Sequence, residues 1–132
     1  MKILLAYDGG DPARRALDAT ASFALKFDAS VAVVSVIPVH AGRAPIDPWD
    51  DASVHAAQLL DAKHRLNAVG IKPELLEQAG DPATTIERIV DDGGYDMVVL
   101  GSRDLGTVSR ALMGSVSAHV ATHAAATVVI AR

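Results

Sequence analysis

Four short, nearly continuous runs of apolar residues constrain most strongly what this chain can fold into. The runs are rich in Val and Ile and cover residues 3–7, 31–37, 97–100 and 127–131. Such runs are typical of strands that are buried on both faces, as in parallel sheets. A weaker stretch, 72–78, carries two leucines among charged residues, so we expect it to form an edge strand.

The segments between these runs repeat apolar residues every three or four positions, which is typical of helices with one buried face. The pattern predicts four helices, the second of which stops near Gly70. Their predicted buried faces consist of Ala13, Ala16, Leu17, Thr20, Ala24 and Phe27; of Ala57, Leu60, His64 and Leu66; of Ala83, Ile86, Ile89 and Val90; and of Val116, Val120, His123 and Ala124.

Strands that alternate with helices favour a parallel sheet with right-handed connections and helices on both of its faces. The chain has 132 residues, which is close to the usual size of one domain. We therefore predict an α/β fold, namely a single three-layer, Rossmann-like domain over residues 1–132. Its sheet is expected to be five-stranded and mostly parallel, with four helices distributed over both faces.

Two of the predicted helices begin with the same three residues. Asp11-Pro12-Ala13 and Asp81-Pro82-Ala83 each offer an Asp as N-cap, followed by a Pro at the first helical position. The Asp side chain can accept from backbone N–H groups that have no partner in the helix, and Pro has no N–H to leave unpaired.

Composition excludes several classes of protein. The chain has no cysteine, so a disulfide scaffold, a thiolate metal site and a cysteine nucleophile are all excluded. A net charge of -4 and only five aromatic residues (one Trp, two Tyr, two Phe) argue against a nucleic-acid partner. The first apolar run is too short for a signal peptide or a membrane span. We expect a cytoplasmic protein with no membrane insertion.

The turn after the first predicted strand is one candidate site, because ligands of parallel sheets bind beyond the carboxyl ends of the strands. This turn reads Asp8-Gly9-Gly10-Asp11. Glycines permit a tight turn and a close approach of a ligand. Asp8 is placed to accept a hydrogen bond from a ribose or a base, although a tight strand-to-helix turn alone would also explain the residues. No dinucleotide fingerprint and no Walker loop is present.

The segment after the fourth strand is the second candidate. It contains Gly101-Ser102-Arg103-Asp104-Leu105-Gly106 and then Gly114-Ser115-Val116-Ser117, and we expect Gly114-Ser115 to open the last helix. Backbone N–H groups at a helix start, with small side chains, make an anion site. Arg103 adds a planar cation that can pair with phosphate. A generic α/β loop with helix caps is the alternative.

These segments resemble the universal stress protein family along nearly the whole chain. The similar stretches are Ile3 to Gly9, Val31 to Val39, Gly80 to Ala83 with Ile86, Tyr95 to Leu100, Gly101 to Ser117, and His123 to Arg132. Nucleotide-binding members carry a Gly, two residues, a Gly, nine residues, and then Gly with Ser or Thr. Gly101 matches the first Gly of this motif, and Gly114-Ser115 close it at the same spacing.

The resemblance implies a stress-response protein that binds ATP, ADP or AMP, with or without Mg²⁺, and acts through conformational signalling. It places Asp8 on the ribose, the adenine between the positions of Ala6, Tyr7 and Val36, and the phosphates on Ser115, Val116 and Ser117. It assigns no catalytic residue, so we expect at most a weak ATPase activity.

Asp104 departs from the motif, because it stands where nucleotide-binding members have the middle Gly. A carboxylate about 5 Å from a phosphate costs roughly 3 kcal/mol at an effective dielectric constant near 20, which is about two orders of magnitude in affinity. Arg103 or a bound Mg²⁺ would offset this charge. The alternative function is a dimeric interaction module that does not bind ATP.

Two further features bear on partners and metals. Family members commonly pair their last strand with its twin, so the resemblance implies a homodimer through Thr127–Arg132, and it leaves a further protein partner unidentified. His119 and His123 have the four-residue spacing that helical metal sites use. The sequence suggests no third ligand, so we expect these histidines to serve the helix surface or its packing.

Other α/β lineages fit less well. A phosphorelay receiver would need an Asp at the end of its third strand, where the chain has Leu75 to Gln78. A flavodoxin would need a Ser/Thr-rich loop after the first strand, and the Gly-x-Ser-x-Gly elbow of hydrolases is missing.

Overall fold

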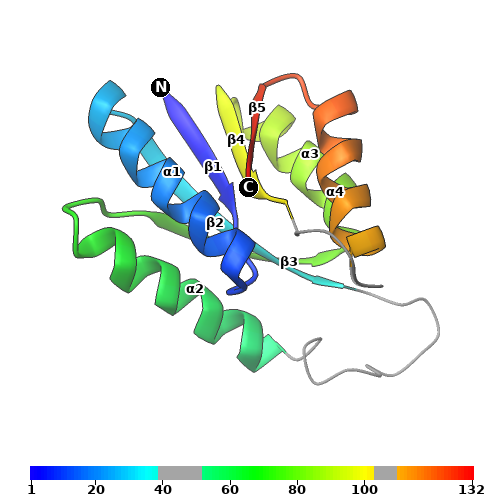
Figure 1. Cartoon of the computed structure of the whole chain (residues 1–132), viewed down its shortest axis with the longest axis horizontal. Helices are drawn as coiled ribbons and strands as arrows, with labels where there is room; N and C mark the ends of the chain where they lie inside the picture. Colours follow the sequence, from blue (N-terminus) through cyan, green and yellow to red (C-terminus); the bar gives the residue numbers. More distant parts are fainter. Residues whose placement is uncertain (39–51, 103–109) are drawn as a thin grey trace.

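Strands and helices alternate along the chain in a computed structural model, which describes residues 1–38, 52–102 and 110–132, the last range with backbone only for 110–115. Figure 1 shows their arrangement. The elements are β1 (Lys2–Ala6), α1 (Asp11–Phe27), β2 (Ser30–Pro38), α2 (Ala52–Asn67), β3 (Glu74–Gly80), α3 (Pro82–Gly93), β4 (Met97–Gly101), α4 (Arg110–His123) and β5 (Thr127–Ala131).

The strands form one sheet in the order β3-β2-β1-β4-β5, and every pairing among them is parallel. Ile3 of β1 is level with Val31 of β2 on one side and with Met97 of β4 on the other. The predicted α/β architecture is therefore confirmed. The weaker stretch forms β3 at one edge of the sheet, as its charges indicated, and β5 forms the other edge.

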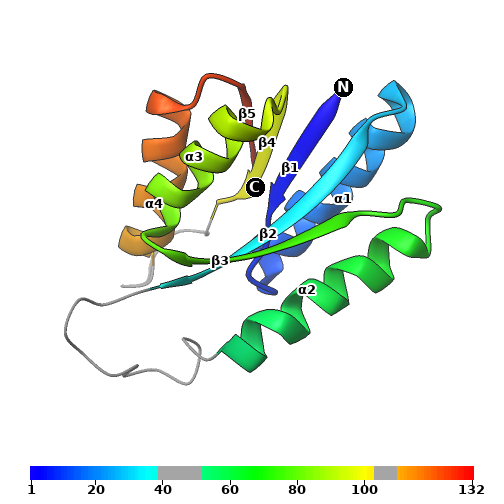
Figure 2. The same cartoon turned by 180° about the vertical axis from the view of Figure 1, so that it is seen from behind.

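Helices cover both faces of the sheet, which explains why the central strands are continuously apolar. α1 and α2 pack on one face, and α3 and α4 pack on the other (Figures 1 and 2). Neighbouring residues of β1 point to opposite sides, so Leu5 belongs to the core under α1 and α2, and Leu4 belongs to the core under α3 and α4. Both leucines are fully buried. No helix in the described ranges is long and apolar enough to span a membrane.

The predicted buried face of α2 is wrong by a rotation of the helix. Ala57, Leu60 and His64 are exposed, and of the predicted residues only Leu66 is buried. The buried face consists of His55, Leu59, Ala62 and Leu66. Three of these residues are apolar at helical spacing, and the fourth makes a buried polar contact, since His55 Nδ1 lies 2.5 Å from the hydroxyl of Ser35 in β2.

Two other residues that we expected in buried faces are exposed. Phe27 lies in the last turn of α1 and stacks on Phe23 at 6.3 Å between ring centroids, with 48% of its surface exposed. His123 lies in the last turn of α4. The remaining predicted residues of α1, α3 and α4 are buried or half-buried, with Ala13, Ile86 and Val120 among the buried ones.

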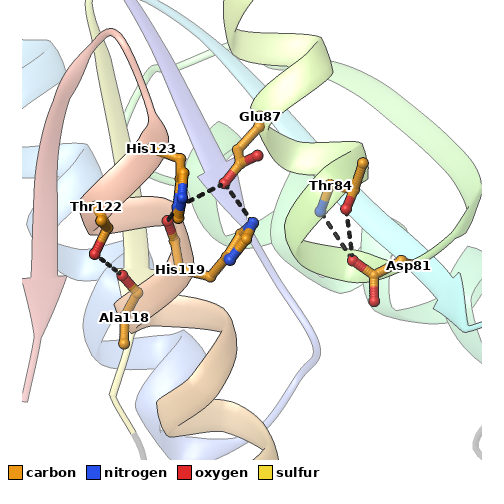
Figure 3. Close-up of polar contacts among 7 residues, drawn as sticks. All are labelled: Asp81, Thr84, Glu87, Ala118, His119, Thr122 and His123. Carbon is orange, nitrogen blue, oxygen red and sulfur yellow. Dashed lines mark hydrogen bonds and ion pairs between the residues drawn. The ribbon is translucent and has the colours of Figure 1, made fainter.

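The two Asp-Pro-Ala segments do not cap their helices in the same way. Asp81 is the N-cap of α3, and its Oδ2 accepts from the backbone N–H of Thr84 (3.0 Å) and from its hydroxyl (2.9 Å), as Figure 3 shows. The N-cap of α1 is Gly10, so the expectation for Asp11 is wrong. The helix starts one residue earlier than expected, and Asp8 Oδ1 accepts from the N–H of Gly10 (3.0 Å) in the turn before it.

Gly101 ends β4 against the first turn of α1. A Cβ atom added to Gly101 would lie 2.4 Å from the carbonyl carbon and oxygen of Pro12 and 2.8 Å from the backbone nitrogen of Ala13. Only a residue without a side chain permits this approach, which brings the carboxyl end of β4 to the start of α1.

The unequal caps predict unequal losses of stability. Asp81→Ala should lower the free energy of unfolding by about 1 kcal/mol at pH 7, because two donors of Thr84 lose their acceptor. Asp11→Ala should cost less than half of that, because it removes only a charge near the positive end of α1. Urea denaturation of both variants and the parent protein measures the difference, and equal losses would contradict the assignment of the caps.

The cap of α3 also predicts a pH dependence. Its hydrogen bonds to Thr84 lower the pKa of Asp81 below its ordinary value. The folded carboxylate therefore stabilises the protein above the unfolded pKa of about 3.9, and this contribution is lost as the pH falls through the lowered folded pKa. The stability difference between Asp81→Ala and the parent protein should shrink over that acidic range.

The close approach at Gly101 predicts a large effect of one methyl group. Gly101→Ala should destabilise the protein by about 2 kcal/mol or more, because the contacted atoms of Pro12 are backbone and cannot rotate away. Gly10→Ala, at the N-cap of α1, is the matched control. Its added Cβ would lie 3.3 Å from Asp8 Oδ1 and would meet no backbone atom within 4 Å. Thermal unfolding in which Gly101→Ala costs no more than Gly10→Ala would contradict this packing.

Candidate functional site

The strand order identifies one edge of the sheet as the place for a ligand. Starting from β1, the chain builds β2 and β3 to one side and then places β4 and β5 on the other side of β1. The carboxyl ends of β1 and β4 thus flank the point where the strand order reverses, which is where open α/β sheets bind ligands. Asp8 follows β1 at this point, and Gly101 ends β4 there.

The turn after β1 is built around the carboxylate of Asp8. Its Oδ1 accepts from the N–H of Gly10. This oxygen therefore stabilises the tight strand-to-helix turn, which was one of the two interpretations of the Asp8 segment. Gly9 adopts a φ of +80°, a conformation that favours glycine. A Cβ on Gly9 would lie 3.2 Å from Cγ of Gln58, so the side chain of Gln58 in α2 packs against the turn. The N–H of Gly10 thus holds the half-buried carboxylate of Asp8 at the reversal point.

Tyr7 points into the core under α1 and α2. Its side chain is 3% exposed, and its hydroxyl donates to Asp61 Oδ2 of α2 (2.6 Å). Burial, with help from this hydrogen bond, raises the pKa of Tyr7 to about 12. The same hydrogen bond lowers the pKa of Asp61, whose carboxylate also accepts from Arg65 Nε at 3.1 Å. The hydroxyl of Tyr7 therefore stays protonated and ties β1 to α2.

Ala6 and Val36 lie on the opposite face from Tyr7. Both are half-buried and pack on the core under α3 and α4, together with Val116. The three residues that the resemblance assigned to the adenine are thus divided between the two faces. Ala6 and Val36 share an apolar surface at the carboxyl edge with α4, and Tyr7 contributes its ring to the other core.

The last helix begins earlier than expected. α4 starts at Arg110, so the expectation that Gly114-Ser115 opens this helix is wrong. In a helix that starts there, the N–H groups without an intrahelical partner belong to the first four residues, 110–113, and those of Ser115, Val116 and Ser117 point to carbonyls of the preceding turn. Val116 is half-buried and Ser117 is buried. Their backbone is not an open anion site in this arrangement.

Two residues of the candidate site lie outside the described residues, namely Arg103 and Asp104. The described residues before Arg103 end at Ser102, whose N–H donates to the carbonyl of Ala131 in β5 (2.8 Å). Gly114 and Ser115 are described by their backbone alone, within α4.

Residues that we did not single out from the sequence also reach this edge. Ser35 contacts His55 Nδ1 at 2.5 Å and Gln58 Oε1 at 3.3 Å, and Gln58 in turn contacts the turn at Gly9. The signal for this cluster was Ser35 itself, a polar residue within an apolar strand.

A second missed residue, outside this cluster, is Glu87 of α3, which lies beside His119 and His123 of α4. No periodicity within one helix could indicate that contact.

A surface hollow lies at the opposite end of the molecule. Its volume is about 530 Å³, and it is lined by Lys63, Asn67, Gly70, Ile71, Lys72 and Pro73. These residues belong to the end of α2 and the segment before β3, at the amino end of the sheet. The hollow therefore lies far from the reversal point and shares no residue with the candidate site.

The whole chain is similar to known proteins of one family. The model of the universal stress protein family matches residues 1–132. A universal stress protein of Thermus aquaticus is 29% identical over 137 residues, which cover 98% of this chain and 97% of that protein.

Two solved structures share the fold. One is a universal stress protein in complex with cAMP, with a TM-score of 0.80, 23% identity and coverage of 100% of this chain and 97% of that one. The other is a universal stress protein family protein of Arabidopsis thaliana with AMP bound, with a TM-score of 0.71, 22% identity and coverage of 99% and 90%. Since the family model matches from the first residue to the last, the chain belongs to the universal stress protein family.

Proposed function

We propose that this protein binds an adenine nucleotide, namely ATP, ADP or AMP, at the carboxyl edge of β1 and β4, and acts in a stress response by binding and conformational signalling. One observation carries the proposal: the reversal point between β1 and β4 brings the turn of Asp8 and the first glycine of the nucleotide motif, Gly101, to the same edge. The solved relatives with cAMP and with AMP support it.

The chemistry of this edge suits the three parts of a nucleotide. Ala6 and Val36 offer an apolar surface for the base, and Asp8 offers a carboxylate for the ribose hydroxyls. The positive end of α4 lies at the same edge, with the N–H groups of its first turn, and attracts phosphates. Arg103 and the hydroxyls of Ser115 and Ser117 would add to this, with Mg²⁺ where the nucleotide brings it.

Binding rather than turnover is the proposed activity. We assign no catalytic residue, and any ATP hydrolysis would be slow. We place the protein in the cytoplasm, with a further protein partner that responds to the nucleotide-bound form.

A second candidate function is a dimeric interaction module that does not bind ATP. Asp104 in place of the middle glycine favours it, because a carboxylate near the phosphates repels them. The position of Ser115 to Ser117 inside α4 favours it too, because nucleotide binding through their N–H groups would need the start of this helix to unwind.

Calorimetric titration of ATP with Mg²⁺ tests the two functions. The stripped parent protein should bind ATP, and Asp104→Gly should bind it about 100-fold more tightly, since the repelling charge and the side chain are both removed. Asp104→Asn removes the charge alone and should recover most of that gain. Asp18→Asn, at an exposed site on α1, is the control and should leave the affinity unchanged.

Two outcomes would decide against parts of this proposal. If neither the parent protein nor Asp104→Gly releases heat up to millimolar ATP, and the purified protein carries no adenine nucleotide by mass spectrometry, the chain does not bind nucleotide. If both bind with equal affinity, the charge of Asp104 has no effect on the site.

We further propose a homodimer that pairs β5 with its twin. β5 is an edge strand of the described sheet, and Ile130 on it is 38% exposed. Thr127 donates to the carbonyl of Asp96 (3.1 Å), and Ala131 accepts from Ser102. Because alternate residues of a parallel strand bond to the same neighbour, Val128 and Ile130 direct their N–H and C=O groups to the open side. An open apolar edge invites a second strand.

Ile130→Pro tests this dimer, because it removes an outward N–H and leaves the bonds to β4 in place. Light scattering after size-exclusion chromatography should show a dimer for the parent protein and for Ile130→Val, and a monomer with an unchanged circular dichroism spectrum for Ile130→Pro. A parent protein that is monomeric at 100 µM, or an Ile130→Pro variant that stays dimeric, would exclude pairing through β5.

A further inference from the structure

Three side chains that can bind a metal ion converge between α3 and α4. They are Glu87 of α3 and the exposed pair His119 and His123 of α4, and one ligand atom from each lies within 4.8 Å of the others (Figure 3). Their side chains are 19%, 44% and 55% exposed, so the two imidazoles are open to solvent and the carboxylate is mostly covered. This cluster shares no residue with the proposed nucleotide site.

The carboxylate of Glu87 lies against the imidazole of His119 without a hydrogen bond. Glu87 Oε1 is enclosed and accepts no hydrogen bond from the described residues, although His119 Nε2 is 3.0 Å away. A nitrogen and an oxygen that bind one zinc ion in a tetrahedral site are about 3.3 Å apart. The observed separation is therefore compatible with both atoms facing one cation.

His123 has one hydrogen bond of the kind that a ligating histidine usually has. Its Nδ1 lies 2.9 Å from the backbone carbonyl oxygen of His119, and a carbonyl oxygen can only accept, so this nitrogen carries the proton. Metal-binding imidazoles generally donate their second N–H to such an acceptor, and Nε2 is then the ligand atom. Nδ1 also lies 3.9 Å from Glu87 Oε1, so the His123 ring must turn to direct Nε2 to a shared ion. His119 and His123 lie four residues apart on α4 and therefore share one face of the helix, where their rings stack with 4.2 Å between centroids.

We propose that Glu87, His119 and His123 form a binding site for a divalent transition-metal ion of the zinc type, which joins α3 to α4. Two imidazoles and a carboxylate suit Zn²⁺, Co²⁺, Ni²⁺ or Cu²⁺, whereas Mg²⁺ and Ca²⁺ prefer oxygen ligands alone. Three protein ligands leave the fourth tetrahedral position to water. The ordinary alternative is an ion pair between Glu87 and a protonated imidazole, and the test separates the two.

Calorimetric titration of Zn²⁺ into the tag-free, metal-stripped protein at pH 7.5 tests the proposal. We expect one Zn²⁺ per chain, and a rise in Tm of about 8 °C at a zinc concentration one hundred times the Kd. Mg²⁺ should produce neither effect. Co²⁺ should give the intense visible absorption of a four-coordinate site, which scattered surface histidines do not produce.

Variants of the three ligands provide the decisive comparison. Glu87→Gln, His119→Gln and His123→Gln should each weaken zinc binding by about tenfold or more and abolish the cobalt spectrum. His64→Gln, which removes an exposed histidine of α2, is the matched control and should change neither. Circular dichroism without metal checks that each variant is folded.

Two results would overturn the proposal. In the first, zinc binds with the same affinity to the parent protein and to the three ligand variants, which would show adventitious binding elsewhere. In the second, the parent protein shows no zinc-dependent rise in Tm and no cobalt spectrum, which would leave Glu87 and His119 as an ion pair only.

Discussion

Burial of β1 on both faces is the constraint on which the rest of the structure depends. Leu4 and Leu5 are both fully buried, on opposite sides of the same strand, so helices must cover the sheet twice. With right-handed connections, a chain can cover both faces only if it builds outward from β1 in one direction and then in the other. The reversal between β1 and β4, and with it the place for a ligand, follows from the packing of the core.

Most of the fold could be predicted from the sequence, because strands buried on both faces leave a continuous apolar signal. The face of α2 was missed, although Leu59, Ala62 and Leu66 are apolar and have helical spacing. The polar His55 completes this face through its buried contact with Ser35, which hydropathy does not indicate. Asp11 failed as a cap because the helix starts one residue earlier than expected, with Gly10 as its N-cap and Asp11 as its first residue.

The candidate site was predictable only in part. Asp8 and Gly101 follow from the rule for strand ends, which needs no contact between distant residues. Tyr7 lies opposite Ala6 because neighbouring strand residues alternate between faces, but the bond of its hydroxyl to Asp61, 54 residues away, could not be predicted from local pattern. Glu87 is a further example: helical spacing pairs His119 with His123, but only the packing of α3 against α4 supplies the carboxylate.

Both proposed sites draw on α4, and this has a thermodynamic consequence. Ser115 belongs to the first half of the helix and Ser117 lies at its middle, whereas His119 and His123 lie nearer its end. The apolar anchor of α4 is small, with Val120 the buried apolar residue among its described side chains. An ion that holds the histidines against Glu87 would restrict where the helix start can lie. If nucleotide binding also depends on the position of α4, each ligand must change the affinity of the other by the same factor.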